Sequence, residues 1–105
     1  MKKILALSTA LCATGFAASA DVTVMSWGAA YSTSQIEGYN KPFTAATGIT
    51  VNMVDSDNPA APVRAMVEAN NVTNDMADVN YADAVRYCDE GLLEPIDPAI
   101  LPAGA

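Results

Sequence analysis

Three extended runs, each followed by a stretch with helical spacing, constrain this chain more than any other feature. The runs are 21–27, 47–54 and 75–80. Strands that alternate with helices are typical of an α/β fold, in which a parallel sheet has helices on both of its faces. Such folds bind ligands in the crevice beyond the carboxyl ends of the strands. We therefore expect strands at 22–27, 49–54 and 76–79, and the residues that follow them are the first candidates for a binding site.

The first two helical stretches have recognisable start and stop signals. Ser32 and Gln35 have the spacing of a capping box, which predicts a helix start at Ser32. Pro42 should interrupt this helix because it cannot donate a backbone hydrogen bond, and Gly48 suits a left-handed helix end. Pro62 fits the first turn of the second helix. An apolar stripe should turn the first helix toward the sheet: Ile36, Tyr39, Phe43 and Ala46.

The third helical stretch begins after the third strand. Asn80 is a suitable cap, and Asp83 lies three residues later, where negative charge suits the helix dipole. Val85, Cys88 and Leu92 are expected on its inner face. Cys88 has no partner cysteine after residue 20, so the pattern predicts a small buried hydrophobic side chain rather than a disulfide.

Residues 1–20 have the pattern of a cleavable signal peptide. Lys2 and Lys3 give a positive start, residues 4–18 are mostly apolar, and small residues precede Asp21. The apolar stretch is shorter than the ~20 residues that a membrane-spanning helix needs. The sequence therefore predicts export to the periplasm and a mature chain that begins at Asp21.

Charge and length bound what the exported part does. After residue 20 the chain has three basic and twelve acidic residues, a net charge of −9. Nucleic acid and anionic membranes repel such a surface, so neither is expected as a partner. Residues 21–105 are also few for a sheet covered on both faces. We expect them to be the front part of a longer protein.

Most catalytic schemes lack essential residues. The chain has no histidine, so neither a Ser-His-Asp triad nor a Cys-His pair can form from its residues. One cysteine after residue 20 does not make a zinc site. The run that begins at Asp55 and Asp57 starts like a calcium loop, but Pro59 and Ala60 stand where a ligand and a glycine are needed. No catalytic residue, cofactor or metal is expected.

The candidate ligand-binding residues all follow the first or the third strand. An aromatic ring such as Trp27 can hold a cationic group or a carbon chain, with a core role as the alternative. Tyr31 packs either at the same edge or under the first helix. Capping alone explains Asn80, and a surface charge alone explains Asp83. The complete set of candidates is Trp27, Gly28, Tyr31, Asn80, Tyr81 and Asp83.

Three segments resemble bacterial periplasmic solute-binding proteins of ABC importers, in particular the spermidine/putrescine class. The segments are 24–28, which holds the tryptophan and glycine; 42–51, the passage from helix to strand; and 87–97, the exit from the third helix. The resemblance implies the N-terminal part of a periplasmic-binding-protein type II-like lobe. Residues 21–105 would be the first part of lobe 1, with the second lobe absent.

The resemblance also implies a function. A small cationic solute, such as putrescine or spermidine, would be trapped between two lobes and delivered to an ABC transporter membrane permease by a monomeric receptor. Trp27 would pack against the carbon chain of the solute, and Asn80 would supply a polar contact beside Tyr81. Three alternatives stay open: another ligand, such as ferric iron, an amine or an amino-acid derivative; an exported enzyme whose catalytic residues lie beyond residue 105; and a short interaction module that ends near Ala105.

Overall fold

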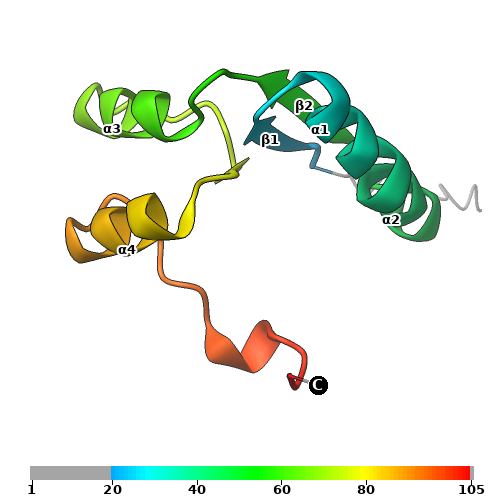
Figure 1. The fold of residues 1–105 in the computed structure, drawn as a ribbon. Helices are drawn as coiled ribbons and strands as arrows, with labels where there is room; N and C mark the ends of the chain where they lie inside the picture. Colours follow the sequence, from blue (N-terminus) through cyan, green and yellow to red (C-terminus); the bar gives the residue numbers. More distant parts are fainter. Residues whose placement is uncertain (1–19, 105) are drawn as a thin grey trace, which may run out of the picture.

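The computed structural model describes residues 20–104 and contains a three-stranded parallel sheet with the strand order β2-β1-β3 (Figure 1). The strands are β1 (Val22–Ser26), β2 (Val51–Asp55) and β3 (Met76–Ala77). The predicted α/β class is confirmed. The predicted signal peptide lies outside the described residues, apart from Ala20.

The strand bounds differ from the expected ones at their ends. Strand β1 pairs with β2 over five positions, from Val22 opposite Val51 to Ser26 opposite Asp55. It pairs with β3 at only two positions. Trp27 lies outside β1 because the backbone turns away at Gly28, whose φ is +80°. Strand β2 begins two residues later than expected, at Val51, and β3 ends at Ala77 rather than at Val79.

The first helix is continuous but changes its winding twice. It consists of α1 (Ala29–Gln35), a π-helical turn η1 (Ile36–Asn40) and α2 (Lys41–Thr47). The expected interruption at Pro42 is confirmed, because α-helix resumes at Lys41 with the proline in its first positions. Gly48 ends α2 in the left-handed conformation, as expected.

The expected helix start at Ser32 is wrong. Helix α1 begins one turn earlier, at Ala29, and its N-cap is Gly28 with no side-chain capping bond. Ser32 lies inside the helix and is buried, because its hydroxyl is bonded to the backbone of Gly28 and to a carboxylate of β2. A partner distant in the sequence thus replaces the local cap.

The remaining helices are α3 (Ala60–Glu68), α4 (Tyr81–Asp89) and the short 3-10 helix η2 (Pro98–Ile100). A small core joins α3 to α4, and its buried members are Ala60, Val63 and Tyr87. The Tyr87 hydroxyl donates a hydrogen bond of 2.7 Å to the carbonyl oxygen of Ala60. The expected inner face of α4 is therefore partly wrong: Cys88 and Val85 are exposed, and Tyr87 faces the neighbouring helix instead.

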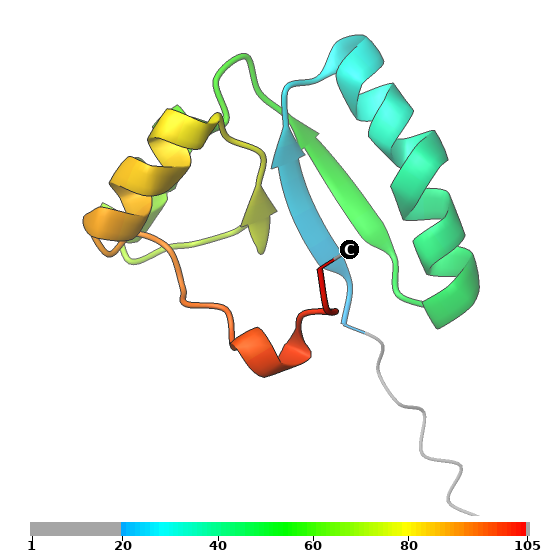
Figure 2. The ribbon, with the colours of Figure 1, turned by 60° about the horizontal axis from the view of Figure 1, so that its bottom comes forward.

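The helices lie in two groups on either side of the sheet (Figures 1 and 2). Helices α1 and α2 flank one side, and α3 and α4 lie together on the other. Alternation along β1 matches this division: Val24 faces the groove beside α2, whereas Met25, on the opposite face, is buried. The apolar stripe of the first helix is only partly buried, since Phe43 and Tyr39 remain exposed beside that groove.

Candidate functional site

The strand order creates a switch point between β1 and β3. From β1 the chain crosses to β2 on one side, and then returns past β1 to place β3 on the other side. Right-handed crossovers in opposite directions put their helices on opposite faces of the sheet and leave a crevice at the carboxyl ends between them. Trp27 follows β1 and Asn80 follows β3, so both come directly after strands at this carboxyl edge.

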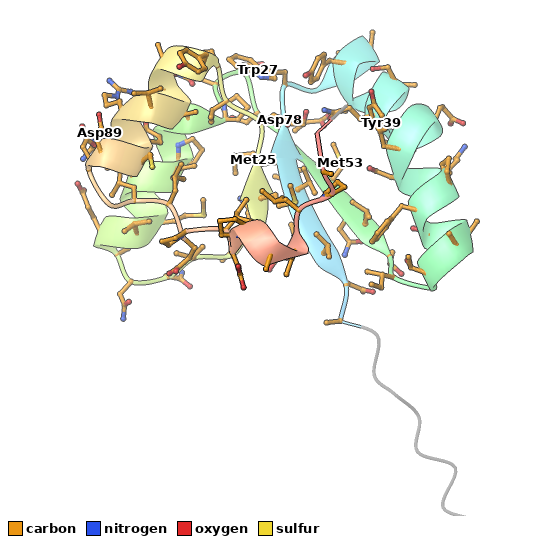
Figure 3. All side chains as sticks on the ribbon, turned by 90° about the horizontal axis from the view of Figure 1, so that it is seen from below. Met25, Trp27, Tyr39, Met53, Asp78 and Asp89 are labelled. Carbon is orange, nitrogen blue, oxygen red and sulfur yellow. The ribbon has the colours of Figure 1, made fainter. Side chains whose placement is uncertain are left out.

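Three aromatic rings at or near this edge are accessible to solvent. Trp27 is 38% exposed, Tyr31 is 50% exposed and Tyr81 is 85% exposed. Figure 3 shows Trp27 at the sheet edge, in the space between the two groups of helices. A fully buried core role, which the sequence left open for Trp27, does not describe this exposed ring. The edge instead presents aromatic faces that can stack on a solute.

Gly28 gives the connection after β1 a backbone shape that other residues rarely adopt. Its φ is +80° and its ψ is −176°, a combination that is essentially restricted to glycine. A Cβ at this position would lie 3.2 Å from the Cβ of Asp55. The glycine therefore allows the connection to turn sharply while it passes close to the end of β2.

A group of hydrogen-bonded polar side chains includes Ser26, the residue that precedes Trp27. The Ser26 side chain is fully buried, and its hydroxyl oxygen lies 2.7 Å from both Gln35 Oε1 and Asp78 Oδ2. The Gln35 amide nitrogen also donates to Asp78 Oδ2, at 2.7 Å. The single hydroxyl proton of Ser26 serves one acceptor at a time, and Gln35 supplies the second donor to the carboxylate. This Ser26 group joins β1, α1 and the segment after β3.

A second polar group lies on the other side of Trp27. The Ser32 hydroxyl accepts a hydrogen bond of 3.1 Å from the Gly28 amide and donates one of 2.7 Å to Asp55 Oδ1. This Ser32 group joins the start of α1 to the end of β2. Sequence reasoning assigned no binding role to Asp55 or Asp78. The available signal was a carboxylate at or just after the end of each neighbouring strand.

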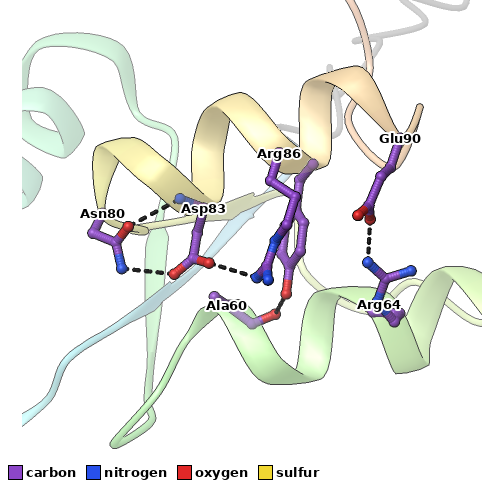
Figure 4. Close-up of polar contacts among 7 residues, drawn as sticks. Ala60, Arg64, Asn80, Asp83, Arg86 and Glu90 are labelled. Carbon is purple, nitrogen blue, oxygen red and sulfur yellow. Dashed lines mark hydrogen bonds and ion pairs between the residues drawn. The ribbon is translucent and has the colours of Figure 1, made fainter.

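Asn80 and Asp83 are engaged in capping α4 (Figure 4). Asn80 Oδ1 accepts a hydrogen bond of 2.9 Å from the Asp83 amide, and Asn80 Nδ2 donates one of 2.6 Å to the Asp83 carboxylate. Asp83 also pairs with Arg86 at 2.5 Å. The predicted cap is therefore confirmed. In this conformation the two side chains are occupied by each other, and Tyr81 is the accessible residue between them.

Two further ion pairs on α3 and α4 involve Arg64. Arg64 pairs with Glu68 at 3.8 Å. It also pairs with Glu90, as Figure 4 shows. The hydrogen bond that it donates to Glu90 raises the pKa of the Arg64 guanidinium. The exposed Arg64–Glu90 pair joins α3 to the end of α4, whereas the Arg64–Glu68 pair lies within α3.

Two grooves of the described chain are apolar and lie elsewhere. One, of about 370 Å³, runs between the sheet and the first helix, and the other, of about 730 Å³, lies beside α3 and residues 91–96. Neither is lined by a predicted ligand-binding residue. Among residues 20–104, no cluster of three or more Cys, Asp or Glu side chains is placed to hold a metal ion. In the same range, no helix has the length and apolar character needed to cross a bilayer.

Comparisons with known proteins match most of the chain. Residues 38–104 match the family described as bacterial extracellular solute-binding protein. A gamma-aminobutyric acid-binding protein of Pseudomonas aeruginosa is 38% identical over 90 residues, which cover 86% of this chain and 26% of that protein.

A solved structure of similar fold is that of the PBP AgtB from A. tumefaciens R10 in complex with agropinic acid. It superposes with a TM-score of 0.73 at 33% identity and covers 80% of this chain and 26% of that one. The present chain thus spans about a quarter of the length of both proteins.

Proposed function

Because the chain belongs to the bacterial extracellular solute-binding protein family, we propose that it forms part of the first lobe of the receptor of an ABC importer. The family is a solute-binding family rather than an enzyme family, which removes the alternative of an exported enzyme. In this proposal the protein captures a small solute outside the cytoplasmic membrane, in the periplasm, and delivers it to a membrane permease. The observation that carries the proposal is the edge at the switch point, where exposed aromatic rings follow β1.

The proposed ligand is a small solute with a primary amine on a short methylene chain. Putrescine and spermidine have this chemistry, and so does gamma-aminobutyric acid, which adds a carboxylate at the other end. The name of the Pseudomonas relative supports the amino-acid form. The acidic surplus after residue 20 supports an amine in either form. We favour the amino-acid form because the identity to that relative extends over most of the chain.

Each predicted residue has a role in this proposal. Trp27 and Tyr31 would pack against the carbon chain of the solute, and Gly28 would keep the space beside the indole open. Tyr81 would approach from the β3 side of the crevice, above the Asn80–Asp83 cap. In this role Asn80 and Asp83 contribute mainly by fixing where Tyr81 lies, because they are bonded to each other.

A calorimetric panel tests the proposal. The protein used is the natural protein, meaning the product of the complete reading frame that contains residues 1–105. Titration with gamma-aminobutyric acid, putrescine and spermidine should show saturable binding of at least one. Trp27→Ala should weaken that binding by about 0.5–2 kcal/mol, or roughly 2- to 30-fold in Kd, because the indole face is lost.

Two controls make the panel specific. Trp27→Phe retains a ring and should lose less affinity than Trp27→Ala. Tyr39→Ala removes an exposed aromatic ring that lies beside the first groove and not at the strand ends, so Kd should stay unchanged. Binding of gamma-aminobutyric acid alone would assign the amino-acid form, and binding of the polyamines alone would assign the cationic form. A folded protein that binds none of the three would contradict the proposed ligand class.

A further inference from the structure

We propose that the Ser26 group and the Ser32 group together hold the connection 26–28 from both sides, and that they thereby position Trp27 for the solute. This inference rests on the proposed function only for its effect on affinity. The positioning itself is a property of the unliganded protein. Ser26 and Ser32 are positioning residues in this proposal, because their buried side chains act on the solute only through Trp27.

The Ser26 group fixes the residue before Trp27. Ser26 ends β1, and its hydroxyl is bonded within a group that includes α1 and the segment after β3. Every oxygen–oxygen or nitrogen–oxygen distance in this group is 2.7 Å. Ser26 is 0% exposed, so its hydroxyl is shielded from water, whereas Gln35 and Asp78 are half-buried beside the first groove. A polar group with a buried hydroxyl and several close partners favours one conformation.

The Ser32 group fixes the residue after Trp27. The Gly28 amide donates to the Ser32 hydroxyl, which in turn donates to Asp55 at the end of β2. Ser32 is 4% exposed, so its bond to the Gly28 amide is shielded from water, whereas the acceptor Asp55 is exposed. Residues 26 and 28 are thus each tied to a neighbouring strand segment by a side chain, and Trp27 lies between the two anchored residues.

The backbone of this connection needs such support. Gly28 has a φ of +80°, and Ala29, which is not a glycine, has a φ of +50°. Glycine adopts a positive φ freely, whereas it is costly for Ala29, and such strain persists only where surrounding contacts determine it. The two polar groups are the contacts that do so here. Positioning a ring before the solute arrives spares the binding step the cost of ordering it.

The test measures the order of Trp27 directly. The natural protein is labelled with 5-fluorotryptophan, and the Trp27 fluorine resonance is identified as the one that a Trp27→Phe variant lacks. Wild type should give one sharp resonance without ligand. Ser26→Ala and Ser32→Ala should each broaden or split it, because the connection then exchanges between conformations. Affinity for gamma-aminobutyric acid or putrescine, whichever the panel identifies, should fall about 3- to 10-fold.

The matched control is Ser34→Ala. Ser34 lies on the same helix and is exposed, and its hydroxyl bonds only to the Tyr31 carbonyl oxygen. This variant should leave both the resonance and Kd unchanged. Asp55→Asn retains an oxygen that can accept from Ser32, so the resonance should remain single and sharp. Should Asp55 also contact the solute, Kd alone would change.

The outcomes separate this inference from the proposed function. A broadened or split Trp27 resonance in Ser26→Ala or Ser32→Ala supports the positioning of Trp27 by the two polar groups. This holds even if no solute of the panel binds and the ligand proposal fails. If the Trp27 resonance is as sharp in both variants as in Ser34→Ala, the proposed positioning of Trp27 is overturned, whatever affinities are measured. If Ser26→Ala fails to fold, the resonance of Ser32→Ala tests the inference alone. We expect Ser32→Ala to fold, because its acceptor Asp55 is exposed and can bond to water instead.

Discussion

Replacing Tyr87 by alanine should lower the free energy of unfolding of the natural protein by about 3–5 kcal/mol. The ring is only 3% exposed and fills the small core between α3 and α4. Its hydroxyl also satisfies the buried carbonyl oxygen of Ala60, and the guanidinium carbons of Arg64 and Arg86 lie 5.7 and 5.0 Å from the ring centroid. One substitution thus removes apolar packing, a hydrogen bond and two cation–π contacts. Urea denaturation followed by circular dichroism measures the loss.

Two variants separate these contributions. Tyr87→Phe keeps the ring and leaves the Ala60 oxygen without its donor, so it should cost about 1–3 kcal/mol. Tyr81→Ala removes a tyrosine from the same helix whose ring is 85% exposed. It should change the stability by less than about 0.5 kcal/mol. A Tyr87→Ala protein as stable as Tyr81→Ala would contradict the core described here.

Replacing Gly28 by alanine should have the second largest effect. The backbone conformation at this residue is essentially restricted to glycine, and forcing another residue into it costs about 1–3 kcal/mol. The new Cβ would also press on Asp55 at 3.2 Å. Because the connection 26–28 must shift to relieve this, we expect lower stability, by denaturation, together with weaker solute binding by calorimetry.

Gly48→Ala provides the matched comparison. Gly48 also has a positive φ, +76°, but an added Cβ there would have no neighbouring atom within 4 Å. Its conformation is the ordinary left-handed helix end, which costs another residue about 1–2 kcal/mol. Solute affinity should stay unchanged, because Gly48 lies at the far end of the helix from Trp27. Equal losses of affinity in the two variants would contradict a specific role for Gly28.

Local signals predicted the fold well because they are read within a few residues. The alternation of strands and helices, the interruption at Pro42 and the caps at Gly48 and Asn80 each depend on neighbouring residues. The errors arose where a distant partner decided the outcome. Ser32 was expected to cap a helix, and instead its hydroxyl is bonded to Asp55, 23 residues away. Tyr87 displaced Cys88 from the inner face because its hydroxyl reaches Ala60, 27 residues away.

The site was predictable only in part for the same reason. The position of Trp27 after the first strand was enough to expect it at the sheet edge, since parallel strands end together. The Ser26 group was not predictable, because Ser26 and Asp78 are 52 residues apart. A serine at the end of a mostly apolar strand was the available sign, since a buried hydroxyl requires a partner. The ligand itself stays a proposal that rests on chemistry and on relatives.

The most direct test of the central claim is a crystal structure of the natural protein grown with gamma-aminobutyric acid or putrescine, whichever binds more tightly. The account predicts that the solute lies at the carboxyl ends of β1 and β3, with its methylene carbons within about 4.5 Å of the Trp27 indole. A solute bound at another place, with the Trp27 ring making no contact to it, would contradict the account.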